Sequence, residues 1–121
     1  MLHGIRVLIV EDEALIAMEL SDIVEGSNGV VIGPFRTNRE ALTVLKRQPV
    51  DAAILDLNLA DGEATPIAEM LAAANVPILI CTAGMLPRAM RQQWPDLPIH
   101  RKPVRPGRLV ADLRALFRAA A

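Results

Sequence analysis

The sequence places an acidic residue inside an apolar segment, where stability alone does not call for one. Residues 53–59 (AILDLNL) have the apolar character of a buried strand, deliver Asp56 at its carboxyl end, and then break into Ala60, Asp61 and Gly62. Ionised carboxylates are rarely buried without a partner. Asp56 is therefore a candidate functional residue, and the rest of the chain must supply the groups that meet it.

Three other apolar segments also end in polar residues. Glu11, Asp12 and Glu13 follow the first segment, Thr82 follows the fourth, and Lys102 follows the fifth. Each has an ordinary explanation by itself, because acids can cap a following helix, threonine suits turns, and lysine suits surfaces. If all four segments end at one edge of a sheet, however, their side chains form a site.

Composition restricts the kind of protein that carries these groups. The chain has 121 residues, 52% of them hydrophobic but only 2% aromatic, which predicts one domain with an aliphatic core. A net charge of -1 gives no general affinity for nucleic acid. A single cysteine, the absence of a signal peptide, and the absence of a membrane-length apolar run together predict a cytoplasmic protein.

Two alternating periodicities predict the elements that position the candidate residues. Short apolar, β-branched runs predict five strands, at residues 5–10, 30–32, 51–55, 77–81 and 98–100. Helical spacing of apolar residues predicts helices between them, at residues 14–25, 37–48, 65–74, 86–93 and 106–119. Gly33 and Pro34 are expected to close the second strand, and Thr37 with Glu40 has the spacing of a capping box.

Five strand–helix repeats predict a parallel sheet with helices on both faces. In the strand order 2-1-3-4-5, the first and third strands are neighbours, about 5 Å apart. Sites in such sheets form at the carboxyl ends of the strands. Asp56 should therefore meet Glu11 and Asp12 there, with Thr82 and Lys102 on the adjacent strands.

This set of groups suits phosphoryl transfer. Clustered carboxylates repel one another, and a divalent cation such as Mg2+, which prefers oxygen ligands, relieves that repulsion. Lys102, roughly 10 Å away by strand spacing, is flexible enough to reach a phosphoryl oxygen. Thr82 can donate a hydrogen bond to another such oxygen, and Asp56 can act as the nucleophile.

The chain resembles the receiver domains of response regulators in bacterial two-component signalling. The matching segments are residues 7–12 (VLIVED), residues 54–59 (ILDLNL), Thr82 with Ala83, and Lys102 with Pro103, and the likeness extends from residue 5 to residue 117. Each piece is weakly specific, but together and in order they are a strong signature. The resemblance implies a flavodoxin-like (βα)5 doubly wound three-layer fold, with one receiver domain over residues 1–121 and no effector domain.

The resemblance also implies roles for the site residues. Asp56 would be the phosphoacceptor, receiving its phosphoryl group from a histidine kinase or a histidine phosphotransfer protein. The Mg2+ ligands would be Glu11, Asp12, Asp56 and the backbone carbonyl of Asn58. Thr82 and Lys102 would bind the phosphoryl group, and the Lys102–Pro103 bond would be cis. Such a protein is a phosphoacceptor that catalyses only its own phosphorylation and dephosphorylation.

One family position departs from the usual pattern. Ile99 stands three residues before the lysine, where the family usually has a tyrosine or phenylalanine that couples phosphorylation to the output surface. Coupling is expected instead from movement of Thr82 and the loop of residues 83–85, or from repacking of the short helix at 86–93. Downstream partners are expected to bind the face of the fourth helix, fifth strand and fifth helix. There Leu86, Met90, Trp94 and Ile99 would make an apolar patch bordered by Arg88, Arg91 and Arg101. Alternatively, Trp94 simply covers the edge of its own sheet.

Other functions remain to be weighed. A degenerate receiver would be an interaction module that works without phosphorylation. A flavodoxin-like nucleotide or flavin binder needs a phosphate cradle after the first strand, where Glu11, Asp12 and Glu13 have the wrong charge. An aspartyl-phosphate hydrolase would carry a second aspartate at the position of Asn58.

The remaining reactive side chains have structural explanations. We expect Cys81 and Met85 to be packing residues, and His3 and His100, which lack metal-ligand spacing, to lie on the surface or at a strand edge.

Overall fold

The computed structural model describes the backbone of residues 2–120 and the side chains of residues 2–118. Its centre is a five-stranded parallel sheet in the order β2-β1-β3-β6-β7. The strands are β1 (Arg6–Val10), β2 (Val30–Phe35), β3 (Ala52–Leu55), β6 (Ile78–Thr82) and β7 (Ile99–Arg101). These are the five predicted strands, and their order is the predicted 2-1-3-4-5.

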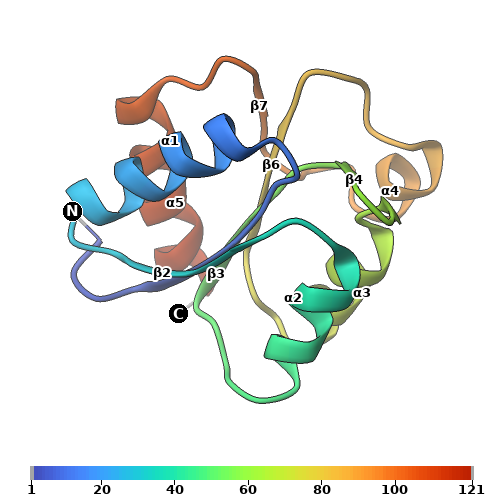
Figure 1. Ribbon diagram of the computed structural model, residues 1–121, viewed down its shortest axis with the longest axis horizontal. Helices are drawn as coiled ribbons and strands as arrows, with labels where there is room; N and C mark the ends of the chain where they lie inside the picture. The colour runs from blue at the N-terminus through green and yellow to red at the C-terminus, as the bar shows by residue number, and fades with distance from the viewer. Residues whose placement is uncertain (1, 121) are drawn as a thin grey trace.

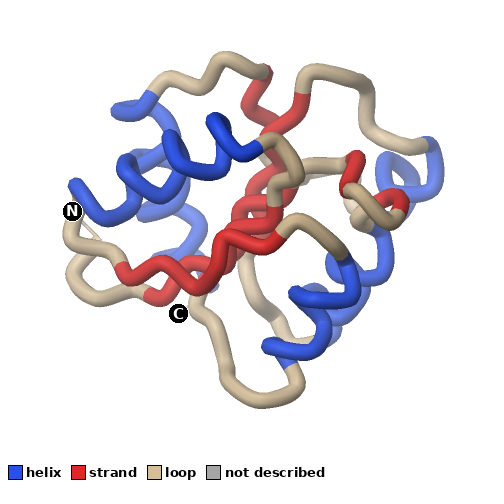
Figure 2. The backbone as a smooth tube through the Cα atoms, viewed as in Figure 1, coloured by secondary structure: helices blue, strands red, loops and turns tan. Residues whose placement is uncertain are grey.

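Helices cover both faces of the sheet (Figure 1). On one face lie α1 (Ala14–Gly26) and α5 (Pro106–Ala120). On the other lie α2 (Asn38–Leu45), α3 (Thr65–Ala73) and α4 (Arg88–Gln93). Figure 2 shows the strands running between these two helical layers. The predicted doubly wound three-layer fold is confirmed.

Alternation of side chains along each central strand produces the two helical layers. In β1, Val7 and Ile9 belong to the core beneath α1 and α5, whereas Leu8 and Val10 belong to the core on the opposite face. Successive side chains of a strand point to opposite faces. Because both faces are covered, the strand is apolar throughout rather than alternating with polar residues.

Asp56 is followed by a small hairpin, which was not predicted from the sequence. Strands β4 (Asn58–Leu59) and β5 (Gly62–Glu63) pair antiparallel, with Asn58 opposite Glu63. The turn holds Gly62 at a φ of +125°, a conformation that favours glycine. Two-residue strands are too short to show a period, so the sequence predicted only a break there.

Asp61, in the turn of this hairpin, caps helix α2. Its carboxylate accepts hydrogen bonds from the backbone N–H groups of Asn38 (2.7 Å) and Arg39 (3.1 Å). These hydrogen bonds hold the pKa of the Asp61 carboxyl below its ordinary value, and the one from the Asn38 backbone N–H has the largest effect. The loop that follows Asp56 is thereby fixed to α2.

The second strand is longer than predicted. It continues through Gly33 and Pro34 to Phe35 instead of closing at Gly33. A β-carbon on Gly33 would lie 2.9 Å from the Ile9 carbonyl oxygen, and the residue has a φ of +110°, so glycine lets the strand pass close to β1. The extension matters for the site because the Phe35 carbonyl accepts a hydrogen bond from Glu11 N–H.

Cys81, Met85 and His100 differ in how deeply the fold buries them. Cys81 is fully buried, as expected of a packing residue, and burial raises the pKa of its thiol to about 12. Met85 is 71% exposed, so the prediction that it packs in the core was wrong. His100 lies in the edge strand, as the strand-edge alternative expected, but it is buried rather than on the surface, with Nε2 2.7 Å from Asp112 Oδ2.

Thr37 provides a test of the local energetics. Its hydroxyl accepts a hydrogen bond from the Glu40 N–H at 3.1 Å and donates one to the Glu40 carboxylate, as the capping-box spacing predicted. We expect Thr37→Ala to lower the free energy of unfolding by about 1 kcal/mol, measured by urea denaturation. Thr43→Ala, which removes an exposed mid-helix hydroxyl of α2 that bonds Arg39 O, is the matched control and should cost less. Equal losses in both variants would contradict the capping role.

Candidate functional site

Backbone hydrogen bonds continue past the strand ends and fix three of the site residues. Asp56 N–H donates to Val10 O (2.9 Å), Glu11 N–H to Phe35 O (2.8 Å), and Lys102 N–H to Thr82 O (3.1 Å). The backbone of each of these three charged residues is therefore hydrogen-bonded to the neighbouring strand, which fixes where its side chain begins. Their side chains meet because parallel strands present their carboxyl ends at one edge.

Four carboxylates gather at that edge. Glu11, Asp12, Glu13 and Asp56 each contribute an oxygen atom, and these atoms lie within 4.8 Å of one another. Glu11 is 1% exposed and Asp56 is 5% exposed, whereas Glu13 is on the surface. Two buried carboxylates side by side repel strongly unless a cation accompanies them.

Lys102 supplies that cation within the protein. Its Nζ lies 2.7 Å from Glu11 Oε1, 3.2 Å from Glu13 Oε1 and 3.4 Å from Asp56 Oδ2, and its side chain is only 9% exposed. The 2.7 Å contact is an ion pair without the directional geometry of a hydrogen bond, and Glu11 Oε1 is buried without a hydrogen bond from the described residues. Strand spacing had placed Lys102 roughly 10 Å from Asp56, and its long side chain spans that gap.

Burial and the neighbouring charges shift the protonation of this pair. Burial, with the adjacent Asp56 carboxylate, raises the pKa of Glu11 to about 7, although Lys102 and the Glu13 N–H oppose the shift. Burial alone would lower the pKa of Lys102, but Glu11, Asp56 and Glu13 outweigh it and raise that pKa above its ordinary value. Lys102 therefore stays charged at neutral pH, while Glu11 is near its titration midpoint.

A pocket of about 180 Å³ opens over these groups. Its lining residues are Asp12, Glu13, Asp56, Asn58, Thr82, Ala83, Gly84 and Lys102. Five of the six residues that the sequence analysis assigned to the site line this pocket, and the sixth, Glu11, contacts Lys102. Thr82 is buried, and its Oγ1 accepts a hydrogen bond from the Gly84 N–H at 3.1 Å.

Glu13 was expected at this edge of the sheet but was not assigned as a metal or phosphoryl ligand. The structure puts its carboxylate in the acidic cluster and against Lys102, and its only sequence signal was its place after Glu11 and Asp12. Glu13, not Asp12, is the N-cap residue of α1, and its side chain makes no capping hydrogen bond. The ordinary explanation of Asp12 as the helix cap is therefore not supported.

The donor set fits a small divalent cation. All the candidate ligands are oxygen atoms, the carboxylates converge, and the buried Glu11 Oε1 lacks a hydrogen bond. Hard cations such as Mg2+ prefer oxygen ligands of this kind. The described residues of the acidic cluster thus suit Mg2+ better than a softer metal, which would select sulfur or imidazole ligands.

The predicted apolar partner patch is only partly at the surface. Leu86 is 9% exposed and Met90 is fully buried, and both pack into the core beside Trp94, which is itself half-buried. Leu86 and Met90 cannot contact a partner without repacking, so their assignment to the patch was wrong. The packing favours the alternative that Trp94 covers its own sheet edge. Ile99 and Arg101 are exposed, as expected.

Comparison with known proteins is consistent with this geometry. Residues 7–114 match the family described as the response regulator receiver domain. The phyllosphere-induced regulator PhyR of Methylorubrum extorquens is 40% identical over 81 residues, covering 64% of this chain but only 30% of PhyR. The chain thus spans less than a third of that relative.

Two solved structures of SdrG are similar over nearly the whole chain. The solution structure of SdrG from Sphingomonas melonis has a TM-score of 0.81 at 36% identity and covers 98% of this chain and 99% of that one. The BeF3-activated conformation of SdrG, from Pseudomonas melonis, has a TM-score of 0.74 at 39% identity and covers 93% and 95%. Among the described residues, moreover, no helix combines the length and apolar character that a membrane crossing requires.

The raised pKa of Glu11 predicts that Mg2+ binding depends on pH. Metal ligands must be deprotonated, so a carboxyl with a pKa of about 7 competes with the metal for its proton below that pH. We expect Mg2+ affinity to rise about tenfold between roughly pH 6 and pH 8, measured by isothermal titration calorimetry. Glu11→Gln should weaken binding and flatten the profile, whereas the exposed control Glu69→Gln should change neither. An unchanged pH profile in Glu11→Gln would exclude this residue as the source.

Proposed function

This chain belongs to the response regulator receiver domain family, and on that premise we propose that it accepts a phosphoryl group on Asp56 and signals through partner binding. Receiver domains of this family are phosphoacceptor modules of two-component signalling. The observation that carries the proposal is the position of Asp56, a buried carboxylate at the pocket, 3.4 Å from the Lys102 ammonium. An acid with only a structural role would not need an opening to solvent.

The proposed transfer uses Asp56 as a nucleophile. A carboxylate oxygen of Asp56 attacks the phosphorus of a phosphohistidine on a histidine kinase or phosphotransfer protein. The phosphorus–nitrogen bond breaks, its electron pair stays on the imidazole, and a phosphorus–oxygen bond forms, giving an acyl phosphate. The donor would approach the pocket beside the start of α1, where Asp12 and Glu13 line its rim.

Lys102 and Thr82 would hold the transferred group. Lys102 is charged and already lies between Glu11 and Asp56, so it needs only a short side-chain movement to pair with a phosphoryl oxygen. The Thr82 hydroxyl, which accepts from Gly84 N–H, still has its own proton to donate. Together these groups would balance the negative charge that builds up around phosphorus.

The carboxylates of Glu11, Asp12 and Asp56, with the backbone carbonyl of Asn58, would hold Mg2+. When bound, that ion supplies positive charge beside the acyl phosphate. Lys102, which now pairs with Glu11, would then be available to a phosphoryl oxygen. Hydrolysis by water would reset the switch, with Asn58 and Gly84 lining the route by which water enters.

Arg101 offers a coupling route in the absence of an aromatic residue at position 99. Its Nη1 donates to the Gly84 carbonyl at 2.9 Å, and the Gly84 N–H donates to Thr82 Oγ1. A movement of Thr82 toward a phosphoryl group would therefore pull on Gly84 and, through it, on Arg101 at the edge of the sheet. This hydrogen-bonded series supports the expectation that the loop of residues 83–85 transmits the signal.

Phosphorylation of Asp56 is testable directly. Incubation with acetyl phosphate and Mg2+ should add about 80 Da, the mass of one phosphoryl group on a carboxylate, read by intact mass spectrometry. The adduct should be acid-stable and base-labile, and it should be absent in Asp56→Asn but present in the control Asp96→Asn, an exposed loop position. If the unaltered protein binds Mg2+ but gains no adduct from acetyl phosphate or a phosphohistidine donor, the degenerate interaction module becomes the better description.

The coupling role of Arg101 has its own test. Beryllofluoride with Mg2+, named in the activated SdrG structure, should shift the backbone amide signals of both the 82–85 loop and β7 in 1H–15N spectra. Arg101→Ala should keep the loop shifts but reduce those in β7 by about half or more, because it removes the hydrogen bond to Gly84. Arg88→Ala, an exposed arginine on α4, should leave both sets unchanged. Intact β7 shifts in Arg101→Ala would rule this route out.

A further inference from the structure

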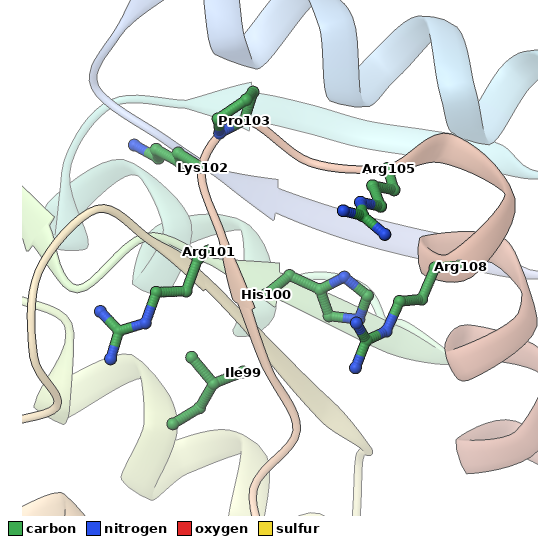
Figure 3. A pocket seen from close by; sticks show the side chains of 7 residues that line it. All are labelled: Ile99, His100, Arg101, Lys102, Pro103, Arg105 and Arg108. Atoms are coloured by element: carbon green, nitrogen blue, oxygen red, sulfur yellow. The ribbon is translucent and has the colours of Figure 1, made fainter.

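A second pocket, of about 540 Å³, lies where β7 leads into α5. Its lining residues are Ile99, His100, Arg101, Lys102, Pro103, Arg105 and Arg108. Figure 3 shows His100, Arg105 and Arg108 on the α5 side of β7, and Ile99 and Arg101 on the other side. The Lys102 side chain points away toward the acidic cluster, so the pocket and the phosphorylation site share this residue but face different directions.

The exposed part of this pocket is cationic and not neutralised locally. Arg101, Arg105 and Arg108 are all exposed, and no acidic residue is among the lining residues. The nearby carboxylate of Asp112 is paired with His100 at 2.7 Å. Within the described residues, Arg105 and Arg108 form no side-chain hydrogen bond or ion pair, so their guanidinium groups are available to a ligand.

The chain is strongly polarised in charge around this pocket. Residues 83–121 contain eight lysines or arginines and two acidic residues. Residues 1–82 contain five lysines or arginines and twelve acidic residues. The net charge of -1 therefore hides a basic segment on an otherwise acidic protein. A local field of this kind attracts oppositely charged partners and orients them toward one face.

Strand β7 adds a backbone feature to the charge. It is the last strand in the sheet, and among residues 2–120 it pairs with β6 alone, so its outer edge is open. An extended segment can bind such an edge, and the planar arginine fork fits carboxylates in two-point contacts. Ile99, 41% exposed, offers one apolar contact beside them.

We propose that this arginine pocket, formed by Arg101, Arg105 and Arg108 around β7, is the docking site for a carboxylate-rich segment of a partner protein. Nucleic acid fits less well, because no aromatic residue is among the lining residues to stack on a base. As a site of signal output the pocket rests on the proposed function, and Arg101, bound to Gly84, joins it to the phosphorylation site.

Binding can be tested on the unphosphorylated protein. A lack of peptide binding can therefore be distinguished from a failure of Asp56 to accept a phosphoryl group. The probe is a fluorescein-labelled peptide of about twelve residues with alternating glutamate and threonine, an extended acidic segment. Anisotropy at low salt should show binding that weakens as salt is added. In 1H–15N spectra, the peptide should shift the amides of residues 99–108 more than those of α2.

Paired charge-removal variants make the test specific. Arg105→Gln with Arg108→Gln should weaken peptide binding by about tenfold or more. Arg36→Gln with Arg39→Gln, an equal charge change at exposed positions beside α2, should alter it by less than about twofold. All four positions are exposed, and equal melting temperatures would show that both variants fold.

Several outcomes would overturn the proposal. These are no binding of the acidic peptide, equal loss in the two double variants, or tighter binding of a thymidine oligonucleotide than of the peptide. Self-association in sedimentation experiments that is lost in Arg105→Gln with Arg108→Gln would instead assign the pocket to the acidic surface of a second copy, and would also overturn it.

Discussion

The contact on which the rest of this structure depends is that of the Lys102 ammonium with the buried carboxylates of Glu11 and Asp56. Burying either carboxylate alone would be costly, and breaking a buried pair leaves an uncompensated charge. These three residues also link strands β1, β3 and β7 at one edge of the sheet, because each directly follows one of these strands. Site and fold are therefore coupled, and a change that removes the ammonium alters both.

One ammonium does not neutralise the four carboxylates of this cluster. Burial, together with the neighbouring Asp56 carboxylate, raises the pKa of Glu11 to about 7 even though Lys102 opposes the shift. A divalent cation held by the carboxylates would relieve this imbalance, and under the proposed function the Lys102 ammonium would then pair with the phosphoryl group.

The fold and the main site residues followed from the sequence because both depend on regular patterns. Alternating strand and helix periods indicated the sheet order, and the carboxyl-end rule brought Glu11, Asp12, Asp56, Thr82 and Lys102 to one edge. The errors arose where contacts between distant segments decide the outcome. Met90 lies in a helix whose apolar spacing does not reveal whether the residue faces the core or a partner. The pairing of His100 with Asp112 leaves no signal in the local sequence. The β4–β5 hairpin was missed because two-residue strands are too short to show a period, and the hydrogen bond of Asp61 to α2 joins segments that are distant in the sequence.

The attachment of Asp61 to α2 also makes the two sides of the phosphorylation pocket mechanically unequal. On one side, the segment that carries Asn58 is tied at its turn to a helix N-terminus by two backbone hydrogen bonds and one from the Asn38 side chain. On the other side, residues 83–85 are exposed, and Gly84 is held by single hydrogen bonds to Thr82 and Arg101. Under the proposed phosphorylation of Asp56, the wall held by fewer hydrogen bonds would move more easily, toward β7 and away from α2.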